Sequence, residues 1–161
     1  MTHADGCELE ISYQTPFAED GARFQKAAEW VAETFGLAAM RVSIAIVDDP
    51  IIHQLNCEYL DHDWPTDVIS FIFEADEAHR TVEGEIIASA QTAARLAGQA
   101  GWPAKDELLL YVTHGLLHLA GLDDIEPDDQ VKMRAAEQAC LLALGVAGAR
   151  EHQARWNDVA T

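Results

Sequence analysis

Apolar and polar residues alternate along four stretches of the chain in a way that is typical of β-strands. In the first stretch Leu9, Ile11 and Tyr13 alternate with polar residues, which is the pattern of a strand with one buried face. Three further strands are predicted over residues 41–47, 67–74 and 83–89. The polar stretch 75–82 predicts a hairpin connection between the last two.

Other stretches carry apolar residues at helical spacing, bounded by residues that start or stop helices. Helices are predicted over residues 19–35, 49–59, 92–100 and 103–120, and from 124–127 to about 144. Asp49-Pro50 is a typical helix start, because the acid can accept at the N-cap and proline fits the first turn. Gly36, Gly101 and Gly121 each follow a predicted helix, where glycine takes the left-handed turn cheaply.

These elements predict a single α+β domain spanning residues 1–161, with an ordered core at about 8–145. The 161 residues are enough to bury most of a single domain's surface, and the hydrophobic content of 49% excludes a disordered chain. The expected architecture is one four-stranded sheet with surrounding helices and a central helix over residues 103–120.

The central helix contains the strongest candidate for chemistry. Its apolar run, residues 108–120, is interrupted only by Thr113, His114 and His118. Thirteen residues are too few to span a bilayer, so the run predicts a helix buried in a globular core. Residues four apart lie on one face of a helix, so His114 and His118 are expected to project together.

The end of this helix adds a carboxylate to the two imidazoles. If the chain turns back after Gly121, Asp123 or Asp124 can lie beside the histidines. Two imidazoles and one carboxylate leave the fourth position of a tetrahedral ion open, which is the composition of a catalytic zinc site. The alternative is two core histidines hydrogen-bonded to carbonyls. A zinc protease is disfavoured, because its general-base glutamate would stand at Gly115.

Residues 114–124 read HGLLHLAGLDD, residues 55–71 read LNCEYLDHDWPTDVISF and residues 84–87 read GEII. These three segments resemble the YbeY endoribonucleases, a family of bacterial rRNA-maturation proteins. The family patterns there are HGxLHLxGYDH, LNxxYRxxDxPTDVLSFP and a GDI strand. Together the three segments cover about residues 40–140 in the family's order. The sequence departs from the patterns at Asp124, Leu60 and Ile72, where the family has histidine, arginine and proline.

The resemblance implies a site built on His114, His118 and Asp124, holding one Zn²⁺ per chain. Because a carboxylate replaces one imidazole, Mn²⁺ is expected to compete better than at an all-histidine site. No side chain is assigned as catalytic, and the expected nucleophile is a water activated by the metal. His62 is a candidate substrate contact because it can become cationic near an anion, and Thr66 and Asp67 can position groups by hydrogen bonding.

The family resemblance further implies cleavage of single-stranded RNA in 16S rRNA 3′-end maturation and ribosome quality control, with the small ribosomal subunit as partner. Three widely spaced cysteines, Cys7, Cys57 and Cys140, favour a reducing, cytoplasmic location. We expect no membrane partner. No glycine-rich phosphate loop occurs in the sequence, so we expect no nucleotide cofactor.

The charge distribution favours an alternative function. The formal net charge is −18, and residues 42–79 contain nine acids and no Lys or Arg. Nonspecific affinity for nucleic acid comes mainly from neutralising phosphates, so an RNA cleft in this span would lack fixed positive charge unless a metal supplied it. The alternative is a ribosome-biogenesis binding protein with a structural zinc and little or no nuclease activity.

Overall fold

The computed structural model describes residues 6–16, 21–60 and 68–149, with the side chains of Tyr59 and Leu60 left out. It confirms the α+β class, with four strands and five helices in this part of the chain. In chain order they are β1 (Cys7–Tyr13), α1 (Ala22–Thr34), β2 (Ala39–Val47), α2 (Asp49–Leu60), β3 (Val68–Asp76), β4 (Thr81–Ser89), α3 (Ala90–Ala100), α4 (Ala104–Leu119) and α5 (Pro127–Ala143).

The strands form one sheet in the order β1-β2-β4-β3. β1 pairs with β2 and β2 pairs with β4 in parallel, whereas β3 runs antiparallel to β4. Parallel neighbours require a crossover, and α1 provides it between β1 and β2. The register of β3 shifts between Ile72 and Glu74, so the strand contains an irregularity at the position where the related family has proline. Proline is tolerated at bulges of this kind.

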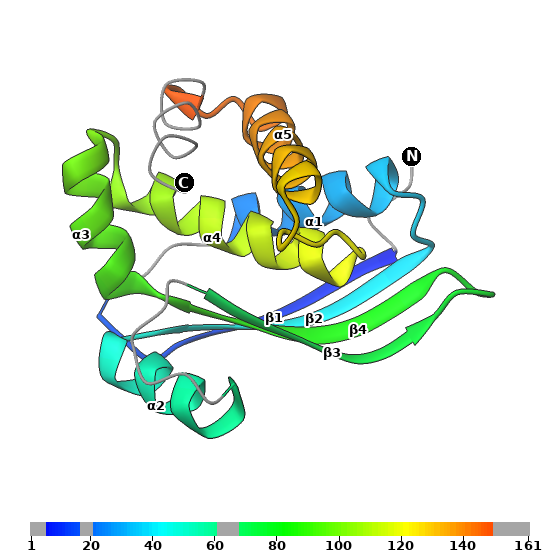
Figure 1. The fold of residues 1–161 in the computed structure, drawn as a ribbon, viewed down its shortest axis with the longest axis horizontal. Helices are drawn as coiled ribbons and strands as arrows, with labels where there is room; N and C mark the ends of the chain where they lie inside the picture. The colour runs from blue at the N-terminus through cyan, green and yellow to red at the C-terminus, as the bar shows by residue number, and fades with distance from the viewer. Residues whose placement is uncertain (1–5, 17–20, 61–67, 150–161) are drawn as a thin grey trace.

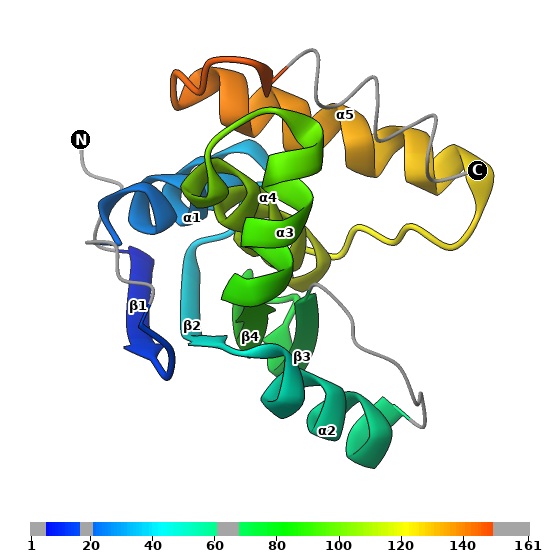
Figure 2. The ribbon, with the colours of Figure 1, turned by 90° about the vertical axis from the view of Figure 1, so that its left-hand side faces the viewer.

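The two faces of the sheet are covered unequally (Figure 1). Helices α1, α3, α4 and α5 lie on one face, and α2 lies on the other, as the rotated view in Figure 2 also shows. The alternation of residues in β2 accounts for this arrangement. Every second residue of the strand is buried in the main core, which also contains residues of α1, α4 and α5: Met40, Val42, Ile44 and Ile46. A smaller cluster under α2 contains Val47, Ile52, Ile69 and Ile87. No helix among the described residues is long and apolar enough to cross a membrane.

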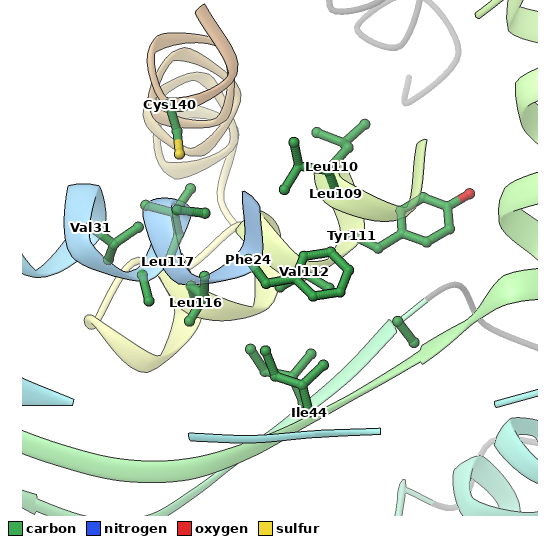
Figure 3. Close-up of a cluster of buried hydrophobic side chains, with 14 of the residues drawn as sticks. Phe24, Val31, Ile44, Leu109, Leu110, Tyr111, Val112, Leu116, Leu117 and Cys140 are labelled. Carbon is green, nitrogen blue, oxygen red and sulfur yellow. The ribbon is translucent and has the colours of Figure 1, made fainter. Parts of the chain in front are cut away.

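Helix α4 lies in the middle of the protein, between the sheet and α5 (Figure 3). Most of the helix from Leu108 onward is apolar and buried on all sides, as expected for a helix inside a core. Ile44 of the sheet points toward Phe24 and Val112, while Cys140 of α5 lies on the other side of α4. This position explains why α4 has the longest apolar run in the sequence, and it places the two histidines at the end of a rigid core element.

The first turn of α4 contains two buried acids that the apolar pattern alone did not predict to be buried. Asp106 accepts a hydrogen bond from Arg23 at 2.8 Å, and Glu107 accepts one from the Trp102 ring nitrogen at 2.6 Å. Buried carboxylates are costly unless they are paired in this way. Both acids also lie at the positive end of the helix dipole, so the start of α4 is held firmly.

Candidate metal site

His114 and His118 lie one turn apart near the C-terminal end of α4 and face each other. Their Nε2 atoms are 3.0 Å apart, and the rings meet edge to face with centroids 4.5 Å apart. The His114 side chain is 12% exposed and that of His118 is 25% exposed. The two imidazoles therefore lie on one face of the helix, as predicted, and both are partly exposed to solvent.

The turn after α4 brings the third group of the site into place. Gly121 has a φ of 106°, a left-handed conformation that favours glycine, and the chain folds back after it. The carbonyl of Leu122 then accepts a hydrogen bond from Nδ1 of His118 at 3.0 Å. Asp124 follows, with Oδ2 at 3.4 Å from Nε2 of His114 and Oδ1 at 3.6 Å from Nε2 of His118.

The structure distinguishes the two neighbouring aspartates. The Asp124 carboxylate converges with the imidazoles, and one ligand atom from each of the three residues lies within 4.8 Å of the others. Asp123 is exposed, and its Oδ1 instead accepts a hydrogen bond from the backbone nitrogen of Asp124 at 2.8 Å. Asp123 thus braces the turn, while Asp124 faces the histidines.

A glutamate from α5, which the sequence analysis missed, contacts the site from behind. Oε2 of Glu137 lies 2.6 Å from Nδ1 of His114, and Arg134 donates to the same oxygen at 2.7 Å. Glu137 is fully buried. The signal in the sequence is its helical spacing, since Glu137 falls four residues after Met133 and three before Cys140, two residues that are buried in the core.

The hydrogen-bond partners determine the protonation pattern of the two rings. Nδ1 of His118 must donate, because a carbonyl oxygen only accepts, and Nδ1 of His114 likewise donates to the carboxylate. In a neutral imidazole the other nitrogen is then a bare acceptor. Burial, followed by the nearness of the second imidazole of His114, lowers the pKa of His118 below its ordinary value, which favours the neutral form of His118 at neutral pH.

These observations fit a divalent metal ion. Two acceptor nitrogens 3.0 Å apart, with a carboxylate beside them, repel one another unless a cation lies between them. Their separation lets both reach one ion at the ~2.0–2.1 Å typical of zinc–nitrogen bonds. The residues that would hold it are His114, His118 and Asp124, which leave a fourth ligand position for water or substrate.

The remaining predicted site residues lie at or beyond the end of the described range 21–60. Leu60 is the last residue of α2, and its side chain lies outside the described part. His62, Thr66 and Asp67, the candidate substrate contacts, also lie outside the described residues. The segment that contains them leads directly into Val68, which packs against the main core cluster to which α4 contributes.

Comparison with known proteins supports the family resemblance. Residues 11–145 match the profile of the family described as Endoribonuclease YbeY. A protein of that name from Rhodopirellula baltica is 46% identical over 107 residues, covering 65% of this chain and 54% of the relative. This chain thus aligns with about half the length of that relative. One from Salinibacter ruber is 34% identical over 143 residues, covering 84% of this chain and 91% of the relative.

A solved structure shows the same fold. The solution structure of a protein from Thermotoga maritima superposes with a TM-score of 0.56 at 21% sequence identity. The match covers 88% of this chain and 95% of the other. At this identity the similarity concerns the arrangement of strands and helices alone.

Proposed function

The chain belongs to the YbeY family of endoribonucleases, and we propose that it is a metal-dependent endoribonuclease whose ion is held by His114, His118 and Asp124. The observation that carries the proposal is the convergence of two imidazole Nε2 atoms and one carboxylate at a partly exposed point. Imidazole ligands suit zinc, and the carboxylate makes manganese a stronger competitor than at an all-histidine site.

The proposed substrate is single-stranded RNA, and the proposed role is maturation of the 16S rRNA 3′ end and quality control of ribosomes in the cytoplasm. The matched relatives are named as endoribonucleases, which supports a hydrolase acting on RNA phosphodiester bonds. The small ribosomal subunit is the proposed partner. His62, Thr66 and Asp67 are proposed to contact the RNA, since they precede β3, and β3 contacts α4.

The mechanism follows from how the residues are held. When bound, a divalent ion would polarise a phosphoryl oxygen and lower the pKa of a water toward ~7. His114 and His118 present Nε2 and keep their protons on Nδ1, which donates a hydrogen bond to a carboxylate in His114 and to a backbone carbonyl in His118. Asp124 contributes a negative charge that offsets part of the ion's charge. We assign no catalytic base among the described residues.

A second candidate function is a ribosome-biogenesis binding protein in which zinc only stabilises the fold. Two features favour it: Leu60 stands where the family has arginine, and no Lys or Arg occurs in residues 42–79. Phosphate contacts supply most of the affinity of proteins for nucleic acids. A chain without them would depend on the metal, or on a protein partner, for its contact with the ribosome.

One experiment separates the two functions. The purified full chain is incubated with a labelled single-stranded RNA, with and without a chelator, while circular dichroism reports folding. The nuclease proposal expects cleavage that stops on chelation, returns with added zinc and occurs while the protein stays folded. Folded, zinc-loaded protein that leaves the RNA intact would support the binding protein instead.

A matched variant pair sharpens this test. His114→Ala removes a proposed ligand and is expected to abolish cleavage. His79→Ala changes a histidine that is 77% exposed beside Asp76 on the β3–β4 turn and is expected to keep it. Equal loss in both variants would contradict the assignment of the site.

A further inference from the structure

We propose that Glu137 is the positioning residue for the metal site and that Arg134 holds it in place. This inference rests on the proposed function only in requiring that a metal binds at His114. It assigns a role to α5, an element that supplies none of the three proposed ligands. The role is to fix the orientation and the tautomer of one imidazole.

Glu137 is a carboxylate in a place where carboxylates are rare. Its side chain is fully buried, and the same face of α5 carries Met133, Cys140 and Leu141, which are also fully buried. Burying an acid in such surroundings is costly unless the acid is paired. Its Oε2 accepts from Nδ1 of His114 at 2.6 Å and from Arg134 at 2.7 Å, so two donors from different elements meet at one oxygen.

The contact with Glu137 determines which nitrogen of His114 faces the site. A carboxylate next to Arg134 accepts hydrogen bonds, so it holds the proton of His114 on Nδ1 and leaves the lone pair on Nε2. That lone pair faces Asp124 and His118. A carboxylate partner on the far nitrogen orients a histidine ligand and makes it more basic, which strengthens its bond to the metal.

The two proposed histidine ligands are held differently, and the difference makes the inference testable. Nδ1 of His118 donates to the backbone carbonyl of Leu122, which no substitution removes. Nδ1 of His114 donates to a side chain, so a single substitution can alter the partner of one ligand while the other stays as it is. The effect of Glu137 on the site can thus be measured separately.

Arg134 acts one step further from the site. It lies one turn before Glu137 on α5, its side chain is only 12% exposed, and its Nη1 atom contacts the same carboxylate oxygen. The pair adds no net charge behind His114, and the guanidinium restricts rotation of the carboxylate. Arg134 therefore holds Glu137 in place, and Glu137 in turn orients His114.

A purely structural role makes a different prediction. If Glu137 only fastened α5 to α4, its substitution would destabilise the metal-free protein and leave the zinc affinity of the folded protein unchanged. A positioning role lowers the zinc affinity of the folded protein itself. Measuring both quantities on one variant separates the two roles.

The test uses the full chain with Glu137→Gln, which keeps the shape of the side chain. Zinc affinity is measured by competition with a chromophoric chelator, and cobalt substitution reports the ligand field through its absorption spectrum. We expect zinc affinity about 10–100-fold weaker and an altered cobalt spectrum. The control is Glu10→Gln, the same change at an exposed residue of β1, with wild-type affinity.

Three outcomes are distinguishable. Wild-type protein that binds no metal contradicts the proposed function. Wild-type protein that binds zinc, with Glu137→Gln binding it equally well, overturns the positioning role alone. If Glu137→Gln does not fold, Glu137→Asp takes its place, because it keeps the charge but withdraws the carboxylate by one methylene. Weaker zinc binding by that variant supports the inference, and unchanged binding overturns it.

Discussion

Gly115 packs directly against Ile86, so that a Cβ added to the glycine would lie 3.0 Å from three atoms of the isoleucine side chain. Gly115 belongs to α4 and Ile86 to β4, and this contact sets how closely the histidine helix approaches the sheet. A long side chain at this position would be directed into the sheet.

Gly115→Ala is therefore expected to destabilise the protein although alanine favours helices. The added methyl group overpacks the contact with Ile86, and the free energy of unfolding should fall by about 1–3 kcal/mol. Urea denaturation measures this change. The matched control is Gly98→Ala in α3, where an added Cβ has no neighbour within 4 Å, and which should be stabilising by roughly 0.5–1 kcal/mol. A stability gain in both variants would contradict the close packing of α4 on β4.

The two aspartates after α4 should differ in their effect on metal binding. Asp124→Ala removes a proposed ligand. Zinc affinity should therefore fall by more than the roughly 10–100-fold expected when a residue that only hydrogen-bonds to a ligand is lost. Asp123→Ala removes a brace on the turn and should have a smaller effect. Asp124→His should keep zinc binding and reduce the competition by manganese. Competition titrations measure all three, and the reverse order of the two alanine variants would identify Asp123 as the ligand.

Leu60→Arg should raise the rate of RNA cleavage. An arginine at this position can pair with a phosphate oxygen and stabilise charge that develops in the transition state. We expect the wild-type chain to be slower than a relative with arginine by roughly 10²–10³-fold. The variant should also steepen the salt dependence of RNA binding by about one phosphate contact. A stable variant with no gain in rate would mean that position 60 is not part of the active site.

Asp49 should make stability depend on pH in acid. Burial alone would raise the pKa of Asp49, but hydrogen bonds from Ser89, Thr92 and Arg95, with the charge of Arg95, lower it below its ordinary value of 3.8. A carboxyl with a lowered pKa stabilises the fold above its ordinary pKa, and the contribution disappears as the pH falls through the lower folded value. The contacts join α2 to β4 and α3.

The corresponding variant is Asp49→Asn. Near neutral pH it should lower the free energy of unfolding by about 1 kcal/mol, a value reduced for the partial exposure of the group. The difference from the wild type should vanish below the folded pKa. Urea denaturation at a series of pH values measures it. Asp128→Asn, at an exposed residue in the first turn of α5, should change stability by less than about 0.5 kcal/mol. A difference for Asp49→Asn that persists in acid would contradict the assigned cause.

Much of the fold was predictable because local pattern determines it. The alternation in β1 and the helical spacing in α1 lie where the sequence placed them, and Gly121 ends the histidine helix in a left-handed turn. The family prediction is also confirmed by the profile match. Element ends were less predictable. Helix α3 begins two residues before Thr92, since the Ser89 side chain caps it by accepting from the Thr92 nitrogen.

Long-range relationships were not predictable from local pattern. The pairing of β2 with β4, and the placement of α2 alone on the second face, depend on contacts between distant segments. The support of His114 by Glu137 spans 23 positions. Glu137 has the helical spacing of the buried residues of α5, but nothing in the sequence identifies His114 as its partner.

The central claim is that one divalent ion held by His114, His118 and Asp124 is required for RNA cleavage. The most direct test is to titrate zinc into metal-free, folded protein and to measure the rate of cleavage of a single-stranded RNA at each step. The account predicts that the rate rises in proportion to added zinc and levels off at one ion per chain. Cleavage by the metal-free protein at the full rate, or a folded protein that takes up one zinc and gains no activity, would contradict it.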